Sequence, residues 1–491
     1  MSDIILSIDQ GTTGTTVLLI DEKLDVRGKG YREFRQIYPE PGWVEHDSDD
    51  IWASVLASIQ EAIQTSGVSV SEIVGIGITN QRETILIWNR ETGQPYHNAI
   101  VWQCRRTSKI VEELKAKGYE SLFQERTGLL LDPYFSGTKL KWQLDNVNSL
   151  PKEVEAKRAI AGTVDTFLTW KLTGGAHVTD VTNASRTLLM DLETLSWDDD
   201  LCSILGVPKS ILPEIRSCSE IYGRTRDVPG LPDGIPVCGM AGDQQAALFG
   251  QTCFKEGEAK CTYGTGGFLL MNTGTTPVRS KNRLLTTIAW KVNDTVTYAL
   301  EGSAFIAGSA VKWLRDGLQF FEETSQIETL ANQVADSGGV TVVPAFVGLG
   351  APHWRSEARG LITGLSLGTH RAHVARATLE GIALQNVEIL QAMVADSNQQ
   401  LVQLKVDGGA SANNLLMQMQ ADFLGCRIIR PQMVETTAMG AAFLAGLGVG
   451  VWKDFDDIAR TWKMDREFQP GIDEKARSQI LARWREAVKK A

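Results

Sequence analysis

The feature that most constrains the fold is a pair of apolar runs at the start of the chain, separated by a short turn. Residues 4–8 and 17–20 are rich in Ile, Leu and Val, and the segment between them contains Gly and Thr. This pattern predicts an antiparallel hairpin. Its turn offers backbone N–H groups and threonine hydroxyls, which are suitable donors to phosphate oxygens. Asp9 ends the first strand, where a carboxylate can hold a hydrated Mg²⁺ against those phosphates.

Two better-known phosphate-binding loops do not fit this turn. No Gly-Lys-Ser/Thr follows it, so it is not a Walker loop, and it lacks the Gly-x-Gly-x-x-Gly pattern of a dinucleotide-binding turn. A Thr-rich hairpin alone is a weak signal for nucleotide binding. The prediction therefore depends on companion motifs further along the chain.

Composition limits the classes of partner. The 491 residues are enough for two or three domains, and the formal charge of −10 argues against a nucleic-acid or anionic-membrane partner. The seven cysteines are scattered without a Cys-x-x-Cys pair, which favours reduced thiols in the cytoplasm. The N-terminus lacks the basic segment of a signal peptide. The uncharged run 438–452 is too short to span a bilayer and predicts a buried helix.

Strand and helix patterns alternate along the chain, which predicts an α/β protein with mixed sheets. A second Gly/Thr hairpin is expected at 259–272, and small-residue turns follow strands at 240–245 and 406–410. We interpret this as a degenerate internal duplication with a boundary near residue 250, giving lobes 1–250 and 251–491. Two such lobes would clamp one nucleotide between their phosphate hairpins. Further predicted elements are a buried strand at 74–79, a strand at 84–88 and helices at 51–64 and 110–117.

Several polar residues are expected at the ends of these strands. Asp243 follows an apolar strand and opens a helix, so it is a candidate general base or second Mg²⁺ contact, or alternatively an N-cap. Arg82 and Glu83 follow the buried strand and could bond neighbouring hydroxyls of a polyol, although such a pair is commonly a solvated surface pair. Trp102 and Tyr134 could form an aromatic wall, although core packing is the default for each taken alone.

Together these segments resemble the FGGY carbohydrate kinases, most closely the members that phosphorylate glycerol. The resemblance runs from Ile4 to about Gly471. The motifs that carry it are Asp-Gln-Gly-Thr-Thr (9–13), Pro-Gly-Trp-Val-Glu-His-Asp (41–47), Gly-Ile-Thr-Asn-Gln-Arg-Glu-Thr (77–84), Ile-Val-Trp-Gln-Cys-Arg-Arg-Thr (100–107), Asp-Pro-Tyr-Phe-Ser-Gly-Thr-Lys (132–139), Ala-Gly-Asp-Gln-Gln-Ala-Ala-Leu-Phe-Gly (241–250), Tyr-Gly-Thr-Gly (263–266), the stretch 360–380 and Val-Asp-Gly-Gly-Ala-x-Ala-Asn-Asn (406–414). It implies a two-lobed actin/hexokinase/Hsp70-like (ribonuclease H-like) fold with ATP in the cleft between the lobes.

The resemblance also implies a role for each matching residue. Asp243 is the implied general base. The residues implied to contact glycerol are Thr12, Arg82, Glu83, Trp102, Tyr134, Asp243, Gln244 and Phe268. Those implied to contact the nucleotide are Thr12, Thr13, Gly14, Thr16, Thr265, Gly308, Lys312, Gly409 and Asn413, with Asp9 and Asp243 at Mg²⁺.

The chain departs from the family pattern at two nucleotide-side positions. Thr16 stands where glycerol-phosphorylating members have Arg, and Lys312 stands where they usually have Gln. One cationic group is lost and another gained. The loop 227–234 also lacks the Arg of members regulated by fructose 1,6-bisphosphate, so that regulation is not expected.

The resemblance implies ATP- and Mg²⁺-dependent phosphorylation of glycerol to sn-glycerol 3-phosphate by a cytoplasmic homo-oligomer, a dimer or tetramer, with no nucleic-acid partner and no stable membrane insertion. Two alternatives remain open. One is a kinase for a longer polyol or ketose such as xylulose, which Arg82, Glu83 and Trp102 disfavour because the pocket looks sized for three carbons. The other is an actin- or Hsp70-like ATPase that controls partner binding, although no peptide-binding domain is evident.

Overall fold

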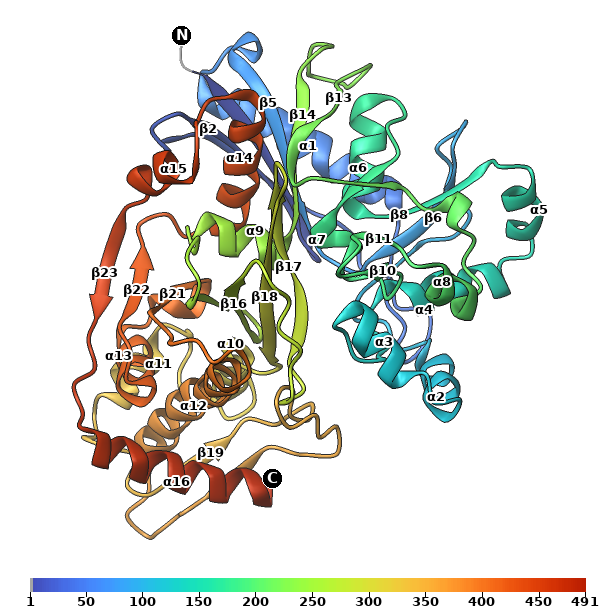
Figure 1. Cartoon of the computed structure of the whole chain (residues 1–491). Coiled ribbons are helices and arrows are strands. Elements are labelled where there is room, and N and C mark those ends of the chain that lie inside the picture. Colours follow the sequence, from blue (N-terminus) through green and yellow to red (C-terminus); the bar gives the residue numbers. More distant parts are fainter. Residues whose placement is uncertain (1–2) are drawn as a thin grey trace.

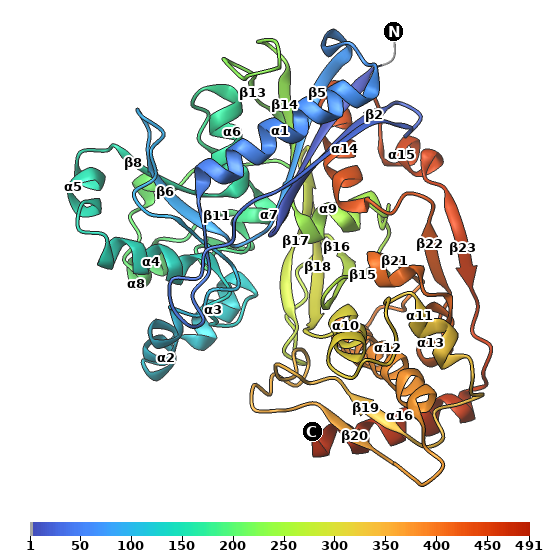
Figure 2. The same cartoon turned by 180° about the vertical axis from the view of Figure 1, so that it is seen from behind.

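The computed structural model describes residues 3–491, which fold into two lobes built around two large mixed β-sheets (Figure 1). The first half of the chain, in blue and green, forms one lobe, and most of the second half, in yellow to red, forms the other. The view from behind shows the same division (Figure 2). The predicted two-lobed α/β architecture therefore agrees with the observed one.

The first sheet has six strands in the order β13-β14-β5-β1-β2-β3. β1 pairs antiparallel with β2 and parallel with β5, which in turn pairs parallel with β14. The strands are β1 (Ile4–Gln10), β2 (Gly14–Asp21), β3 (Val26–Glu33), β5 (Ile73–Asn80), β13 (Ser219–Arg224) and β14 (Pro236–Gly242).

The second sheet has seven strands in the order β17-β18-β16-β15-β21-β22-β23. β15 pairs antiparallel with β16 and parallel with β21, which pairs parallel with β22. The strands are β15 (Glu258–Tyr263), β16 (Gly267–Gly274), β17 (Leu285–Val292), β18 (Thr295–Ala304), β21 (Gln403–Asp407), β22 (Ile428–Pro431) and β23 (Met464–Phe468).

The two sheets repeat one pattern of strand pairing. Each has an antiparallel three-stranded meander, then two parallel pairings and a final antiparallel edge, so that β1, β2, β3, β5, β14 and β13 match β15, β16, β18, β21, β22 and β23. This supports the predicted duplication. It also corrects one detail, because the strand ending at Gly242 corresponds to β22, whereas the strand ending at Asp407 corresponds to β5.

Both predicted Gly/Thr hairpins are present. The first hairpin extends from the Ile4–Asp21 pair to the Gln10–Thr15 pair, and the N–H of Gly11 donates to the carbonyl of Gly14 at 2.9 Å. Its side chains are buried along nearly the whole of both strands, which explains why apolar residues follow one another here and do not alternate with polar residues.

Helix α14 (Thr436–Val449) links the second half of the chain to the first sheet. This is the predicted buried helix, and small residues let it approach the sheet closely. A Cβ on Gly77 of β5 would lie 2.2 Å from the carbonyl oxygen of Ala441. A Cβ on Gly440 would lie 1.8 Å from the carbonyl oxygen of Ala246 in α9 (Asp243–Gly250). No side chain larger than hydrogen fits at either position.

A smaller four-stranded sheet and several helices extend the first lobe and carry part of the candidate site. The sheet order is β4-β7-β6-β8, with β4 (Glu45–His46), β6 (Ile85–Asn89), β7 (Ala99–Ile100) and β8 (Ala159–Thr163). Three two-stranded ladders pair β10 (Met190–Asp191) with β11 (Ser196–Trp197), β9 (Val178–Asp180) with β12 (Glu214–Arg216), and β19 (Thr341–Val343) with β20 (Leu361–Thr363).

The predicted helices at 51–64 and 110–117 correspond to α1 (Ser48–Ser66) and α2 (Ser108–Ala116). The others are α3 (Glu120–Thr127), α4 (Ser136–Asn146), α5 (Leu150–Glu155), α6 (Val164–Thr173), α7 (Val181–Ala184), α8 (Asp199–Leu205), α10 (Gly308–Asp316), α11 (Gln326–Ala331), α12 (Arg371–Ser397), α13 (Asn414–Leu424), α15 (Phe455–Thr461) and α16 (Glu474–Lys490). Short 3₁₀ turns cover Val70–Glu72, Lys209–Ile211 and Gly409–Ala412. None of the helices between residues 3 and 491 is both long and apolar enough to cross a membrane.

Candidate active site

The loop after β5 holds Arg82 and Glu83 in a constrained conformation. Both side chains are buried, and Glu83 has φ of 60°, in the left-handed region that non-glycine residues rarely adopt. The hydroxyl of Ser136 donates to the Glu83 carbonyl at 3.1 Å, and the Lys139 ammonium lies 3.5 Å from the same oxygen. Such backbone strain costs about 1–3 kcal/mol and is typically found at functional sites.

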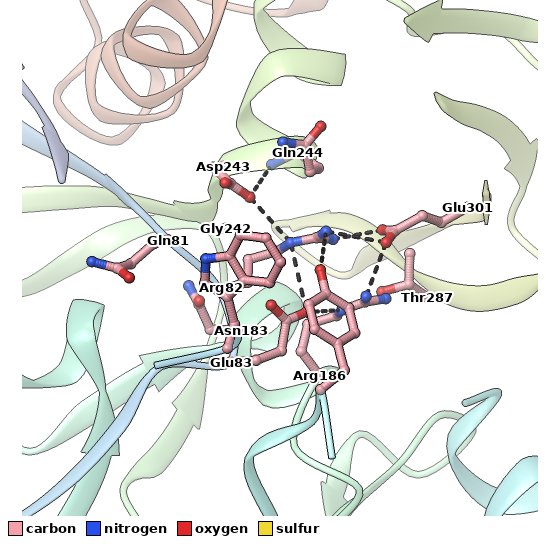
Figure 3. A network of polar contacts seen from close by, with 12 residues as sticks. Gln81, Arg82, Glu83, Asn183, Arg186, Gly242, Asp243, Gln244, Thr287 and Glu301 are labelled. Atoms are coloured by element: carbon pink, nitrogen blue, oxygen red, sulfur yellow. Dashed lines mark hydrogen bonds and ion pairs between the residues drawn. The ribbon is translucent and has the colours of Figure 1, made fainter. Parts of the chain in front are cut away.

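Arg82 is the centre of a buried network of charges (Figure 3). Its Nη1 donates to Glu301 Oε2 at 2.5 Å, and its Nη2 donates to Glu301 Oε1 at 3.1 Å, so the guanidinium binds the carboxylate in a bidentate manner. Arg186 also donates to Glu301 Oε1, at 2.9 Å, and to Glu83 Oε1 at 2.7 Å. All four side chains are 2% exposed or less. The two cations and two anions balance one another.

The two carboxylates of this network differ in their pKa values. Burial acts to raise the pKa of Glu301, but Arg186 and Arg82 outweigh it and lower that pKa to about 2. For Glu83, burial outweighs the same two arginines, and the pKa is raised. The strongly ionised Glu301 is the main anchor of Arg82. Within the described chain no hydrogen bond reaches Glu83 Oε2, so this oxygen is free to accept one from a ligand.

Asp243 lies beside this network at the start of α9. Its Oδ1 is 3.1 Å from Arg82 Nε and accepts a hydrogen bond of 2.7 Å from the N–H of Gln244. The side chain is 30% exposed, in contrast to its buried neighbours, so it can meet a substrate. The alternative of an N-cap is wrong in its detail, because Gly242 occupies that position and Asp243 is the first helical residue.

Aromatic residues lie next to these polar groups. The Trp102 and Tyr134 rings meet edge to face with centroids 5.6 Å apart, and the Trp102 Nε1 donates to the Thr12 hydroxyl at 2.9 Å. Arg82 Nη2 lies 3.4 Å from the Tyr134 hydroxyl. Phe268 is part of β16 and pairs with Ser303, two positions from Glu301, so it is on the same face of the second sheet as Glu301. The other residues predicted to contact a polyol thus form one connected group, whereas Phe268 is placed only on the sheet face that carries Glu301.

The N-terminal hairpin turn lies against the same loop. Gln81 Nε2 donates to the Gly11 carbonyl at 3.1 Å and to the Gln10 side chain at 3.0 Å. Burial, with smaller contributions from Asp243 and Glu435, raises the pKa of Asp9 to about 8. A half-buried carboxylate among other carboxylates fits a divalent cation, which would stabilise its ionised form.

A magnesium ion does not need the protein to supply all of its ligands. Within residues 3–491 no group of three or more His, Cys, Asp and Glu side chains could hold a metal ion. Mg²⁺ is commonly held by one or two carboxylates together with substrate phosphates and waters. Asp9 and Asp243 therefore fit a magnesium–nucleotide complex, whereas a structural metal centre is not indicated.

The residues predicted to contact the rest of the nucleotide come from three loops of the second lobe. Thr265 and Gly308 lie together, because the N–H groups of Ala307 and Ser309 donate to the Thr265 carbonyl at 2.8 and 3.2 Å. A Cβ on Gly308 would lie 2.6 Å from the Gly264 carbonyl oxygen, whereas a Cβ on Gly409 would have no atom within 4 Å. Asn413 caps α13 by accepting a hydrogen bond of 2.9 Å from Leu416 N.

The phosphate-hairpin residues and the two departures from the family pattern occupy different environments. Thr13 is exposed and Gly14 is buried at the start of β2. Thr16 is half-buried and pairs with Asp9 across the hairpin. Lys312 is exposed, one turn into α10. The structure thus places Thr16 and Lys312 on opposite lobes.

Four buried residues of the site were not predicted. They are Lys139, Arg186, Lys260 and Glu301. Lys260 donates to the side-chain oxygen of Gln244 and, at 3.0 Å, to the Thr262 hydroxyl. Glu301 is the single carboxylate of β18, and Lys260 is the single ammonium of β15. A charge in a buried strand is therefore the signal that could have identified both.

Models of known families match most of the chain. The model of the N-terminal domain of the FGGY family of carbohydrate kinases matches residues 4–250, and that of the C-terminal domain matches residues 259–449. The chain belongs to the FGGY family of carbohydrate kinases.

This FGGY chain is similar over its whole length to curated relatives. The glycerol kinase of Bdellovibrio bacteriovorus is 54% identical, over 100% of this chain and 99% of the relative. The glycerol kinase of Myxococcus xanthus is 56% identical, over 99% of each chain. The glycerol kinase of Bacillus subtilis is 54% identical, over 100% of this chain and 99% of the relative.

Comparison with solved structures confirms the predicted fold. The crystal structure of Plasmodium falciparum glycerol kinase with ADP matches with a TM-score of 0.95 and 40% identity, covering 100% of this chain and 98% of that one. The xylulose kinase from Rhodospirillum rubrum matches with a TM-score of 0.86 and 24% identity, covering 99% of this chain and 98% of that one. The second likeness concerns the fold alone.

Proposed function

We propose that this chain transfers the γ-phosphoryl group of ATP to a terminal hydroxyl of glycerol, giving sn-glycerol 3-phosphate and ADP. The observation that carries the proposal is the buried Arg82–Glu83 pair beside the partly exposed carboxylate of Asp243. The relatives that are 52–56% identical over the full length bear the name glycerol kinase, which supports the same substrate.

In this proposal the site binds glycerol by matching each hydroxyl to a fixed polar group. Arg82, Tyr134 and Gln244 donate hydrogen bonds, and Glu83 Oε2 accepts one. Trp102 and Phe268 cover the carbon edge of the substrate. The proposal is supported by the common location of these residues, since Arg82 itself contacts Tyr134 and Asp243.

Asp243 then acts as the general base. It takes the proton from the terminal hydroxyl, the hydroxyl oxygen forms a bond to the γ-phosphorus, and the bond from that phosphorus to the β,γ-bridging oxygen breaks to release ADP. Positioning and neutralisation of charge account for most of the rate, because phosphoryl transfer needs little covalent work from the protein. Closure of the lobes would exclude water, which otherwise competes with glycerol.

The nucleotide is proposed to lie between the two hairpin turns. Thr12, Thr13 and Gly14 contact its phosphates. Asp9, with Asp243, would hold Mg²⁺, which supplies neutralisation of phosphate charge when bound. The remaining contacts are assigned to Thr16, Thr265, Gly308, Lys312, Gly409 and Asn413.

We further propose cytoplasmic action and a homo-oligomer, a dimer or tetramer. Cytoplasmic action is supported by the seven cysteines, none of which is in a disulfide within residues 3–491. Self-association is supported by the exposed Leu365 and Leu367 in the loop before α12. Light scattering coupled to size-exclusion chromatography tests the oligomer, and a monomer at micromolar concentration would contradict it.

The function is tested by a coupled ADP-release assay with glycerol, dihydroxyacetone, xylulose, ribulose or no acceptor. The expected result is the highest kcat/KM with glycerol, with sn-glycerol 3-phosphate detected as product. A preference for xylulose or ribulose would identify a kinase for longer sugars. ADP release that is independent of every acceptor would identify an ATPase instead.

A further inference from the structure

Glu301 comes from a different lobe than the arginines it binds. It lies on β18 of the second sheet, whereas Arg82 follows β5 of the first sheet and Arg186 follows α7. Glu301 pairs with Leu270 on one side and with Leu285 on the other, so it is a central residue of its sheet rather than part of a loop. Its carboxylate is 0% exposed. A rigid strand therefore presents one buried charge to the other lobe.

Arg82 has anchors on two sides. Its two Nη atoms grip Glu301 at 2.5 and 3.1 Å, while its Nε faces Asp243 Oδ1 at 3.1 Å and Glu83 Oε1 at 3.8 Å. The Nε is buried, and within residues 3–491 it has no hydrogen-bond partner of good geometry. The electrostatic attraction of Glu301 for the guanidinium thus opposes that of Asp243 and Glu83. The position of the guanidinium depends on the balance between these attractions.

Arg186 fixes Glu301 and Glu83 relative to one another. Its Nη2 binds Glu301 Oε1 at 2.9 Å, and its Nε binds Glu83 Oε1 at 2.7 Å. The guanidinium therefore bridges the carboxylate of the second lobe and the polyol-contacting carboxylate of the first. The guanidinium carbon of Arg186 also lies 5.2 Å from the centroid of the Phe135 ring, and this packing limits the movement of the side chain. Neither Arg186 nor Glu301 is part of the set assigned above to substrate contact.

From this arrangement we propose that Glu301 is a positioning residue for Arg82, and that Arg186 supports it, so that the polyol site is complete only when the second sheet is docked against the first lobe. The inference rests on the proposed function, because it concerns the binding of glycerol by Arg82. Without the Glu301 charge, Arg82 is drawn toward Asp243 and Glu83 and occupies the groups that the glycerol hydroxyls need.

Glu301→Gln tests the proposal, since it keeps the shape of the side chain and removes its charge. The KM for glycerol should rise about 10- to 100-fold, the range expected when hydrogen bonds to a charged group are weakened. The KM for ATP should stay within about twofold, because no nucleotide contact is altered. Glycerol should also stabilise the variant against heat less than it stabilises the wild type, while ADP stabilises both equally.

Glu380→Gln is the matched control. Glu380 is also a buried glutamate of the second lobe with two arginine neighbours, Arg376 at 3.8 Å and Arg483 at 3.5 Å, but it lies on α12 outside the site. The KM for glycerol of this variant should equal that of the wild type. If Glu301→Gln does not fold, Arg186→Lys replaces it, because a lysine keeps the charge but cannot bridge two carboxylates in this way. The same selective rise in the KM for glycerol is then expected.

An unchanged KM for glycerol in the folded Glu301→Gln variant, or in Arg186→Lys, would overturn the positioning role. An equal rise in the KM for glycerol and for ATP would overturn it too, because that is the effect of general damage to the lobes. These results differ from a failure of the proposed function, in which the wild type itself releases no ADP in response to glycerol.

Discussion

The general-base role of Asp243 gives the most direct prediction. Asp243→Asn keeps the size and shape of the side chain, and the amide oxygen can still accept the hydrogen bond from Gln244 N. An amide cannot take up a proton from the substrate. The kcat should therefore fall by about 10²–10⁴, the usual contribution of a general base, which corresponds to about 2.7–5.5 kcal/mol in the activation barrier.

The fold should tolerate this change. The lost ion pair to Arg82 joins atoms 3.1 Å apart and involves a carboxylate that is 30% exposed, so its loss should lower the free energy of unfolding by about 1 kcal/mol or less. Arg82 keeps both hydrogen bonds to Glu301 and the one to Gln245. The binding of ATP, measured as the shift in melting temperature that the nucleotide causes, should stay close to that of the wild type.

The assay is coupled ADP release at saturating glycerol and ATP. Glu153→Gln serves as the control, because Glu153 is also a partly exposed carboxylate paired with an arginine, Arg158 at 2.8 Å, but it lies on α5 away from the site. The control should keep the wild-type kcat. If the folded Asp243→Asn enzyme turned over within about threefold of the wild type, Asp243 would not be the base.

Three further predictions concern specificity, the nucleotide side and acid stability. Glycerol should be preferred over 1,2- and 1,3-propanediol by up to about 10⁴-fold in kcat/KM, because each diol leaves a polar group of the Arg82–Glu83 pocket unpaired; similar values for either diol would refute that pocket. Lys312 is predicted to compensate in part for the missing arginine at Thr16, so Thr16→Arg should raise kcat or tighten ATP, and a double-mutant cycle with Lys312→Gln should depart from additivity by more than about 0.5 kcal/mol; additive effects would refute the coupling. The pKa of Glu301 is about 2 in the folded protein against an ordinary value of 4.5, so its contribution to stability is complete above pH 4.5 and is lost as the pH falls from 4.5 toward 2; urea midpoints at pH 5, 4 and 3 should fall more steeply for the wild type than for Glu301→Gln, and equal slopes would refute this contribution.

Much of the fold could be predicted because its signals are local. The apolar runs on either side of Gly11–Thr13, the buried strand around Gly77 and the small-residue helix around Gly440 each show their character within about ten to fifteen residues. The correspondence between strand-to-helix turns could not be predicted in detail. It depends on which strands lie side by side in each sheet, and that is a long-range property.

The charged part of the candidate site could be predicted where a residue follows the end of a strand. Arg82 follows β5 and Asp243 follows β14, and these two strands pair in parallel, so their carboxyl ends lie at one edge of the sheet. Glu301 is 219 residues away from Arg82 in sequence, and Arg186 is 103 residues away from Glu83. The contacts to Glu301 arise from the docking of the two lobes, and the Arg186–Glu83 contact arises from long-range packing within the first lobe. A single sequence carries no spacing signal for either.

The buried charges and the strained backbone of the site lower the stability of the protein, and they can be understood from what the site must do. Ion pairs removed from water gain little over well-packed apolar side chains, and the left-handed Glu83 adds a cost of about 1–3 kcal/mol. Apolar side chains in place of this network would therefore make a more stable protein, but they could not hold an arginine at a fixed position next to Asp243. Preorganised charge helps catalysis only if it does not rearrange when the substrate binds. The carboxylates on two sides of Arg82 meet that condition. Glu301, on a central strand of one lobe, attracts the guanidinium from one side, and Asp243 and Glu83 of the other lobe attract it from the other side.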